Sequence, residues 1–178
     1  KLHAPNWFIE NQDGSKNPHD EIDNPFRSAE VLQAHVDEGL HYARKNRLPK
    51  PIANFIPEHQ GTLKMGYFFQ KAKEKNLKIN ENDFRYKGPI PQSKETAILM
   101  LADGCEAALR AMNINASDNE ALETISRIIY SRKKDGQLDN SNLSKGEIFL
   151  IKRAFLNVWK RIRHRRIQYP TTKNNTFS

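Results

Sequence analysis

The chain has 178 residues, 37% of them hydrophobic, and a formal net charge of +8. This length suits one domain with a single hydrophobic core, and the longest apolar run, residues 97–102, is far short of the ~20 residues of a membrane span. The single cysteine, Cys105, excludes an internal disulfide and fits a reducing compartment. We therefore expect this chain to be soluble.

The N-terminus carries no sign of a secretory signal. It begins Lys1-Leu2-His3-Ala4-Pro5, without an initiator Met and without an apolar stretch. We interpret the sequence as part of a longer protein and expect part of the function to lie outside it.

The positive charge is concentrated at the C-terminal end. Six basic residues and no acidic residue follow position 159, so six of the eight excess charges belong to this tail and +2 remains for the rest. Basic residues at the end of a helix are favoured by the helix dipole, and we favour that interpretation. Contact with phosphate or anionic lipid is the alternative. The six residues are Lys160, Arg161, Arg163, Arg165, Arg166 and Lys173.

Apolar residues at three- and four-residue spacing predict a helical first half. Asn24-Pro25 is a good start for the first long helix, and Pro57 is expected to kink the second. Segments without a period and with Gly, Pro and Asn read as loops. The expected elements are helices over residues 25–46, 51–60 and 63–75, and loops over residues 11–24 and 78–92.

The second half is also predicted to be helical. A helix over residues 93–112 has a centre that is apolar all round, which predicts a buried helix. Capping boxes, Ser117 with Glu120 and Ser144 with Glu147, mark the start of two further helices. No alternating strand pattern and no internal repeat is found, so we predict an all-α fold.

Three polar side chains interrupt this apolar pattern and are candidate metal ligands. Asp103 falls on the helix predicted to be buried, where a carboxylate is costly unless a cation or several donors satisfy it. His35 lies on the apolar side of its helix, and Gly39, one turn on, leaves room beside the imidazole. His59 ends an apolar stripe just before Gly61, so its ring can project into a shared cavity.

Each of these residues also has an ordinary explanation. Either histidine alone is more simply a hydrogen-bonded core residue, and Asp103 could pair with Arg110 or cap a neighbouring helix. Imidazole and carboxylate on separate helices suit Fe, Mn or Zn, but three ligands spread over 69 positions are not a specific motif. These residues alone therefore predict only a candidate metal site.

Longer stretches around these residues resemble a known family over nearly the whole chain. They resemble the cytoplasmic HD domain of the seven-transmembrane HD phosphohydrolases, bacterial membrane proteins that hydrolyse cyclic di-AMP. The matching stretches are Ser28-Ala29, Ala34-His35-Val36, Phe55 to Thr62 (FIPEHQGT), Phe84 to Pro89 (FRYKGP), Pro91 to Ala97 (PQSKETA), Leu101-Ala102-Asp103, Glu106-Ala107-Ala108, Asp135 to Leu138 (DGQL) and Arg166 to Pro170 (RIQYP).

The resemblance implies an HD-domain-like helical bundle over residues 1–170, truncated at its N-terminal side, followed by a disordered tail over residues 171–178. The complete domain would hold two divalent metal ions, with Mn or Fe expected. By resemblance, His35 and His59 are ligands of the second metal and Asp103 closes the first. Lys1 corresponds to the Lys after a His-Asp-Ile-Gly segment, so the upstream His and the His-Asp pair would precede residue 1.

The implied reaction is hydrolysis of a cyclic dinucleotide by a metal-activated water, without a side-chain nucleophile. Gln60, Lys94, Arg110 and His19 are the substrate-side candidates. Gln60 departs from the family, which often carries a second His there, and an amide cannot replace imidazole in acid-base work.

The other three candidates have competing interpretations. Lys94 and Arg110 lie near Asp103 in sequence and could reach phosphate, but a solvated Lys and an Arg paired with Glu106 are equally good interpretations. His19 precedes an Asp, yet it lies in a predicted loop and is not the metal-binding pair.

The expected partners are a cyclic dinucleotide and the rest of a parent protein of the bacterial inner membrane, with this domain on the cytoplasmic side. One alternative is a cyclic-dinucleotide sensor without turnover, which Gln60 favours. A nucleic-acid-binding module built on the basic tail ranks last, and no nucleic acid partner is expected. For the chain alone we predict weak metal binding and little activity, because part of the ligand set is missing.

Overall fold

The computed structural model describes Trp7, residues 18–75 and residues 77–166. Within these residues the chain is helical, with one isolated antiparallel bridge between Lys64 and Arg85 and no named strand, which confirms the predicted all-α class. The predicted tail, residues 171–178, lies outside the described residues. In chain order the elements are α1 (Pro18–Ile22), α2 (Pro25–Lys45), α3 (Lys50–Ala53), α4 (Phe55–Glu58), α5 (Gly66–Glu74), the 3₁₀ helix η3 (Glu81–Phe84), α6 (Lys94–Arg110), α7 (Asp118–Lys134) and α8 (Lys145–Arg166).

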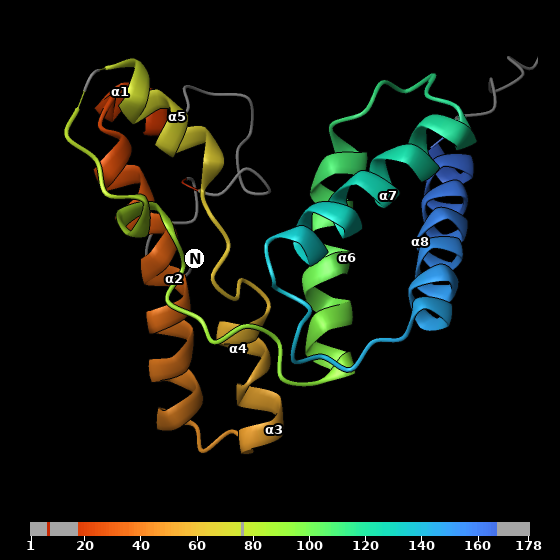
Figure 1. Ribbon diagram of the computed structural model, residues 1–178, viewed down its shortest axis with the longest axis horizontal. Helices are drawn as coiled ribbons and strands as arrows, with labels where there is room; N and C mark the ends of the chain where they lie inside the picture. The colour runs from red at the N-terminus through yellow and green to blue at the C-terminus, as the bar shows by residue number, and fades with distance from the viewer. Residues whose placement is uncertain (1–6, 8–17, 76, 167–178) are drawn as a thin grey trace, which may run out of the picture.

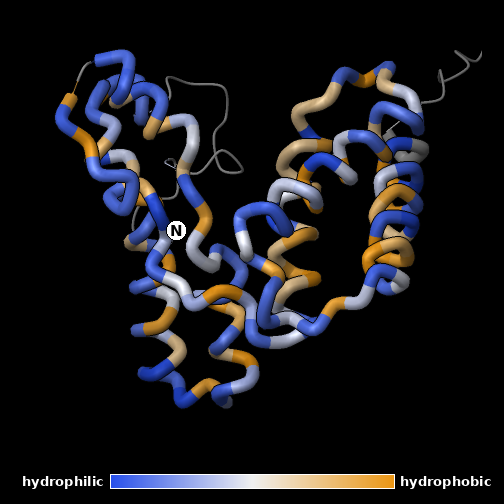
Figure 2. The backbone as a smooth tube through the Cα atoms, in the orientation of Figure 1, coloured by the Kyte–Doolittle hydropathy of each residue, from blue (hydrophilic) through white to orange (hydrophobic). Residues whose placement is uncertain are grey.

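The helices form two arms that meet at the base of the molecule (Figure 1). The α2 arm contains α1, α2, α5 and η3, and the α6 arm contains α6, α7 and α8. The short helix α4 contacts both α2 and α6, so it lies at the junction. Apolar and polar residues alternate along α2 and α8, as expected of amphipathic helices (Figure 2).

Each arm has its own hydrophobic cluster. The α6 arm buries α6 against α7 and α8, and the α2 arm buries α5 and η3 against α2. The buried residues of the α6 arm are Ala97, Leu101, Cys105, Leu109, Ala121, Ile125, Ile129, Leu138 and Ile151. Those of the α2 arm are Ala29, Met65, Phe68, Ala72 and Phe84.

The helix starts predicted from the caps at Asn24, Ser117 and Ser144 are confirmed. The side chain of Asn24 accepts hydrogen bonds from the backbone N–H groups of Phe26 and Arg27, at the start of α2. The capping boxes at Ser117 and Ser144 are both formed. These bonds satisfy N–H groups that have no partner within their own helix.

Several predicted boundaries are wrong. The helix expected over residues 51–60 is divided at Asn54 into α3 and α4. The break falls within the four residues before Pro57, where a proline is expected to interrupt a helix because it has no N–H to donate to the carbonyl of Ala53. The helix expected from residue 63 begins at Gly66. Residues 11–24 are not all loop, because residues 18–22 form α1; residues 11–17 lie outside the described part of the chain.

The late start of α5 has a tertiary cause. The N–H of Met65 donates to the carbonyl of Phe84 at 2.8 Å, and the N–H of Tyr86 donates to the carbonyl of Leu63 at 3.1 Å. This pairing between distant segments uses backbone groups that a longer helix would need for itself.

The centre of α6 is not buried all round, contrary to the prediction. Ala97 and Leu101 are buried in the α6 arm, but Ile98 is 37% exposed and Leu99 is 40% exposed. The reason is that α7 and α8 pack on only one side of α6 in the described part of the molecule.

Two polar bridges join the arms. Gln137, at the end of α7, accepts a hydrogen bond from the backbone N–H of Thr62 at 3.0 Å and donates to its hydroxyl at 2.8 Å. Glu58, in α4, accepts from the hydroxyl of Thr96 in α6 at 2.6 Å and from the backbone N–H of Gln92 at 2.8 Å. Glu58, Thr96 and Gln137 are all buried, so these bonds fix the arms without competition from water.

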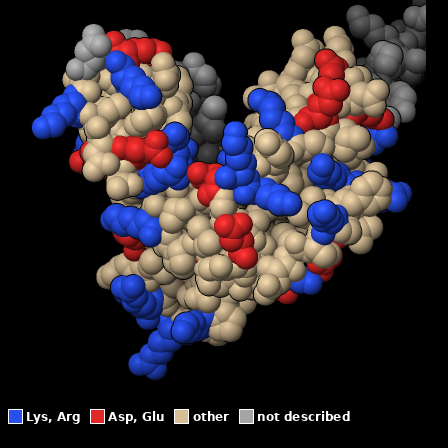
Figure 3. Space-filling model, viewed as in Figure 1, with Lys and Arg blue, Asp and Glu red and all other residues tan. Residues whose placement is uncertain are grey.

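An ion-pair network reinforces the first bridge. The guanidinium of Arg85 contacts Glu81 at 2.8 Å and Asp135 at 3.2 Å, and donates to the carbonyl of Thr62 at 2.9 Å. These two carboxylates raise the pKa of Arg85 above its usual range. Side chains of both signs gather at the centre of this face, between the arms (Figure 3).

Part of the basic run at the end of α8 makes structural contacts. Lys160 pairs with Asp118 at the start of α7, and Arg163 donates to the carbonyl of Ala116 while stacking over the ring of Trp159 at 5.0 Å. These contacts support the interpretation of residues 160–163 as a helix end. Among the described helices, none combines the length and apolar character needed to cross a bilayer.

Gly61 provides a test of the junction. Its φ is +53°, and an added Cβ would lie 2.5 Å from Oε1 of Gln137 and 2.7 Å from Cε of Met100. Left-handed strain and overpacking together predict that Gly61→Ala lowers the free energy of unfolding by about 2 kcal/mol or more. Urea denaturation would measure this loss.

Gly66→Ala is the matched control, because an added Cβ there meets nothing within 4 Å. We expect it to be neutral or slightly stabilising. Equal losses in both variants would contradict the proposed role of Gly61.

Candidate functional site

The structure brings two of the three predicted ligands together. His35 comes from the middle of α2 and His59 follows the last residue of α4. Their ring centroids lie 5.5 Å apart with the ring planes at 66°. Both side chains are half-buried, so the pair lies at the junction of α2 and α4 and not in the middle of either core.

Both rings are oriented in the same way. Nδ1 of His35 lies within hydrogen-bond distance of the carbonyl of Leu32, and Nδ1 of His59 lies 2.7 Å from the carbonyl of Ile56. A carbonyl oxygen can only accept, so Nδ1 must carry the proton and Nε2 carries the lone pair in the neutral ring. Metal-ligating histidines are commonly fixed by such a bond at the other ring nitrogen.

Gly39 has a different role from the one expected. An added Cβ there would lie 2.8 Å from Cγ2 of Ile56, so Gly39 makes room for Ile56 and not for the imidazole of His35. The close approach of α2 and α4 therefore places the carbonyl of Ile56, which orients His59.

Tyr86 forms a third wall of the site. Its ring meets that of His35 edge to face, with centroids 5.9 Å apart and planes at 81°. Burial raises the pKa of Tyr86 well above its usual range, and the negative charge of Asp103 raises it further. The phenol is therefore neutral at physiological pH, and the field of Asp103 reaches the aromatic group beside His35.

Asp103 is exposed on α6, so the expectation of a buried carboxylate is wrong. It lies on α6 next to the exposed side of the apolar centre, where water can solvate it. Burial lowers the pKa of Arg132, and the negative charges of Asp135 and Asp103 oppose this shift. Burial cost therefore gives no reason to place a cation at Asp103.

Within the described part of the chain, no three His, Cys, Asp or Glu side chains are close enough to share a metal ion. His35 and His59 are adjacent, and Asp103 stands on the other arm. The assignment of Asp103 as a ligand thus remains a prediction.

The predicted substrate-binding residues lie on different elements of the structure. Gln60 follows His59 and is half-buried. Lys94 forms an ion pair with Glu147 of α8 at 2.6 Å, and it lies nine residues before Asp103, about 13 Å along the axis and on the opposite face of α6. Arg110 pairs with Glu106 at 3.6 Å, one of the interpretations left open by the sequence.

His19 lies in helix α1 and not in a loop. It is buried against the rings of Trp7 and Phe68, each with a centroid 4.9 Å away, and Nε2 lies 2.9 Å from the carbonyl of Trp7. Burial lowers the pKa of His19. These contacts describe a packing residue of the α2 arm.

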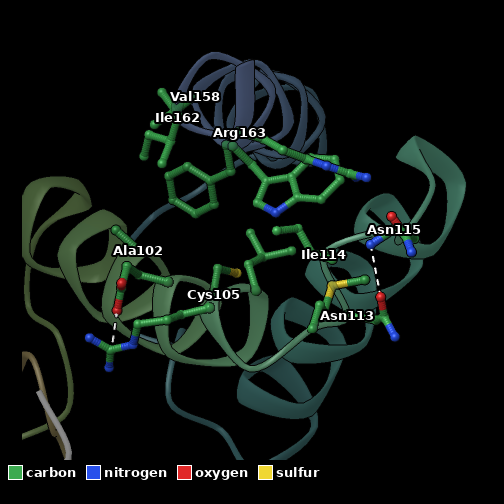
Figure 4. A pocket seen from close by; sticks show the side chains of 14 residues that line it. Ala102, Cys105, Asn113, Ile114, Asn115, Val158, Ile162 and Arg163 are labelled. Atoms are coloured by element: carbon green, nitrogen blue, oxygen red, sulfur yellow. Dashed lines mark hydrogen bonds and ion pairs between the residues drawn. The ribbon is translucent and has the colours of Figure 1, made fainter. Parts of the chain in front are cut away.

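A separate cavity of about 660 Å³ lies between α6 and α8 (Figure 4). Val158 and Ile162 reach into it from α8, and Cys105 lines it from α6. Burial raises the pKa of Cys105 to about 11, so its thiol is protonated at neutral pH and is not an activated nucleophile. Neither predicted histidine ligand lines this cavity.

The sequence analysis missed Tyr86, Arg132 and Glu58. Tyr86 belongs to a stretch that resembles the family, but its loop has no periodicity that would show burial. Glu58 also belongs to such a stretch, and an acidic residue beside Pro57 gives no sign of being buried. Arg132 fits the basic last turn of α7 as a solvated residue.

Known proteins resemble this chain in sequence and in fold. No family model matches the chain. An uncharacterized protein of Synechocystis is 46% identical over 175 residues, covering 96% of this chain and 22% of that protein. The cyclic-di-AMP phosphodiesterase PgpH of Bacillus subtilis is 38% identical over 170 residues, covering 96% of this chain and 24% of that protein.

A solved structure has the same fold as this chain. The crystal structure of the PgpH HD domain of Listeria monocytogenes in complex with cyclic-di-AMP matches with a TM-score of 0.86 and 35% identity. The match covers 91% of this chain and 75% of that HD-domain chain. This chain belongs to the PgpH family of HD domains. The predicted HD-domain fold is confirmed, and the chain spans about a quarter of the length of the curated PgpH relatives that it matches.

The orientation of the HD-domain histidines is directly testable. We expect the neutral rings of His35 and His59 to carry the proton on Nδ1, because each Nδ1 faces a carbonyl oxygen. Long-range ¹H–¹⁵N NMR of the imidazoles at pH 8 distinguishes the two tautomers. Exposed His41 is the internal control and should show mainly the Nε2–H form that is common in solution, whereas Nε2–H signals from His35 and His59 would contradict the assignment.

Proposed function

We propose that this chain is part of a metal-dependent phosphodiesterase that hydrolyses a cyclic dinucleotide, with cyclic di-AMP as the substrate. The proposal is carried by the His35–His59 pair, whose rings are both held through Nδ1, in a chain of the PgpH HD family. The relatives named as cyclic-di-AMP phosphodiesterases supply the substrate class.

The donor set fits a transition metal in part. Two imidazoles with Nε2 lone pairs and one carboxylate suit Mn, Fe or Zn, and Mn or Fe is the metal expected from the resemblance. His35 and His59 would hold one ion, and Asp103 would help to hold the other. The family resemblance implies further ligands, an upstream His and a His-Asp pair.

The metals, when bound, would neutralise charge on the phosphodiester and lower the pKa of a bound water. The residues of this chain then have simple tasks. The carbonyls of Leu32 and Ile56 hold His35 and His59 in the ligating tautomer. The neutral ring of Tyr86 shields one side of His35 from water. Gln60 can donate to a phosphate oxygen but cannot take up a proton.

The cellular setting follows from the family resemblance. We infer that the domain lies on the cytoplasmic side of a bacterial inner-membrane protein and works with the rest of that protein. A cyclic-dinucleotide sensor without turnover is the second candidate, and Gln60 in place of a histidine is the observation that favours it.

The central test is Asp103→Asn in the full-length protein, assayed for cyclic di-AMP hydrolysis with added Mn²⁺. Loss of a metal-binding carboxylate is expected to lower kcat/KM by at least about 10²-fold and to reduce the Mn²⁺ content. Asp118→Asn is the matched control, because this exposed carboxylate at the start of α7 pairs with Lys160 of α8 and its loss should leave activity unchanged.

Other outcomes decide between the candidates. A protein that loads Mn²⁺ and binds cyclic di-AMP tightly without turnover would identify the sensor. A protein that takes up no metal under any condition would contradict both the ligand assignment and the mechanism.

A further inference from the structure

Glu58 is a buried acidic residue to which neither the family resemblance nor the proposed mechanism gives a role. Only 2% of its surface is exposed, and it stands in α4 at the junction of the arms. A single oxygen, Oε2, accepts from the hydroxyl of Thr96 at 2.6 Å and from the N–H of Gln92 at 2.8 Å. A buried carboxyl is costly, and these two bonds offset that cost.

Each residue of this contact is connected along the chain to one predicted ligand, Glu58 to His59 and Thr96 to Asp103. Glu58 directly precedes His59, whose own N–H continues the turn of α4 to the carbonyl of Phe55. Thr96 is seven residues before Asp103 in the unbroken helix α6, which places the two about 10 Å apart along the axis and within about 20° of the same face. A movement of Thr96 relative to Glu58 would therefore move Asp103 relative to His59.

A contact that only stabilised the fold would not need a buried carboxyl group. Apolar side chains of similar size pack such a junction without the cost of burying a carboxyl, but they allow sliding and rotation. Hydrogen bonds of 2.6 and 2.8 Å are directional and fix both the separation and the rotation of α4 and α6. Metal sites depend on this kind of support, since ligands must be held to within about 0.5 Å.

We propose that Glu58 is a positioning residue which, through Thr96, sets the separation of His59 and Asp103 and so the affinity for metal. This inference rests on the proposed function, because it takes His59 and Asp103 as ligands. It adds a residue that touches neither metal nor substrate and acts only by placing the two arms.

The test is the Mn²⁺ affinity of the full-length protein, measured by the EPR signal of free Mn²⁺ during titration. Thr96→Val keeps the shape of the side chain and removes the hydroxyl donor, and Glu58→Leu removes the acceptor. Each is expected to weaken Mn²⁺ binding about tenfold or more, the usual effect of losing support for a ligand. Glu58→Gln retains a carbonyl oxygen that can accept both bonds, so it should restore most of the affinity.

Two controls separate positioning from loss of stability. Thr96 also belongs to the capping box of α6, so Ser93→Ala, which removes that cap but leaves the bond to Glu58, should not change the affinity. Ile129→Val in the core of α7 lowers the melting temperature without touching the junction. If it weakens Mn²⁺ binding as much as Thr96→Val does, the effect follows stability and the inference is overturned.

A double-mutant cycle with Asp103→Asn completes the test. Positioning acts through Asp103, so Thr96→Val should have little further effect once Asp103 is replaced. Equal affinity of the wild type and Asp103→Asn would overturn the proposed function itself. A clear loss in Asp103→Asn with no loss in Thr96→Val or Glu58→Leu would overturn only the role of Glu58.

Discussion

The arrangement of this molecule depends on one short segment, residues 58–62, which is bonded to both arms. Its acidic residue, Glu58, bonds to the start of α6, and its last residue, Thr62, bonds to Gln137 after α7. Between them Gly61 adopts a left-handed conformation that only a residue without a Cβ can take at such close range. His59 lies inside this segment, so the residue that carries the proposed chemistry is fixed by the same bonds that hold the arms together.

The arms need such a segment because their hydrophobic clusters are separate. One cluster is built on α2, α5 and η3, and the other on α6, α7 and α8. Hydrophobic contacts are not directional, so two clusters side by side would leave the angle between them loosely defined. Buried hydrogen bonds at Glu58 and Gln137 are directional and fix this angle. The site at the junction thus has a polar framework, although most of the free energy of folding comes from the apolar clusters on either side.

Local sequence signals predicted the helices well where the signal was itself local. Asn24, Ser117 and Ser144 cap helices as expected, because a cap involves residues only two or three positions apart. Errors occurred where a distant segment decided the outcome. The start of α5 is delayed by pairing with residues 84–86, about twenty positions away, and no pattern near Leu63 indicates that pairing.

At the candidate site, too, local sequence signals did not show which distant segments come together. The pairing of His35 with His59 was expected from the family resemblance, and periodicity alone left each as an ordinary core residue. Asp103 was expected to be buried because its helix is apolar, but periodicity does not tell how many sides of a helix will be covered. The role of Gly39 was also misassigned, since only the structure places Ile56 against it.

The division of the ligands between the arms has a thermodynamic consequence. A pair of metal ions, one held by His35 and His59 and the other held in part by Asp103, would bind the native arrangement and not the unfolded chain, so metal binding would stabilise that arrangement by mass action. This coupling is reciprocal, so any change that loosens the junction lowers the metal affinity. Because the junction is made of a few buried hydrogen bonds and not of a broad apolar interface, each of those bonds accounts for a large share of this coupling. The position of His59 between Glu58 and Gly61 is therefore where fold stability and the proposed catalysis depend on the same contacts.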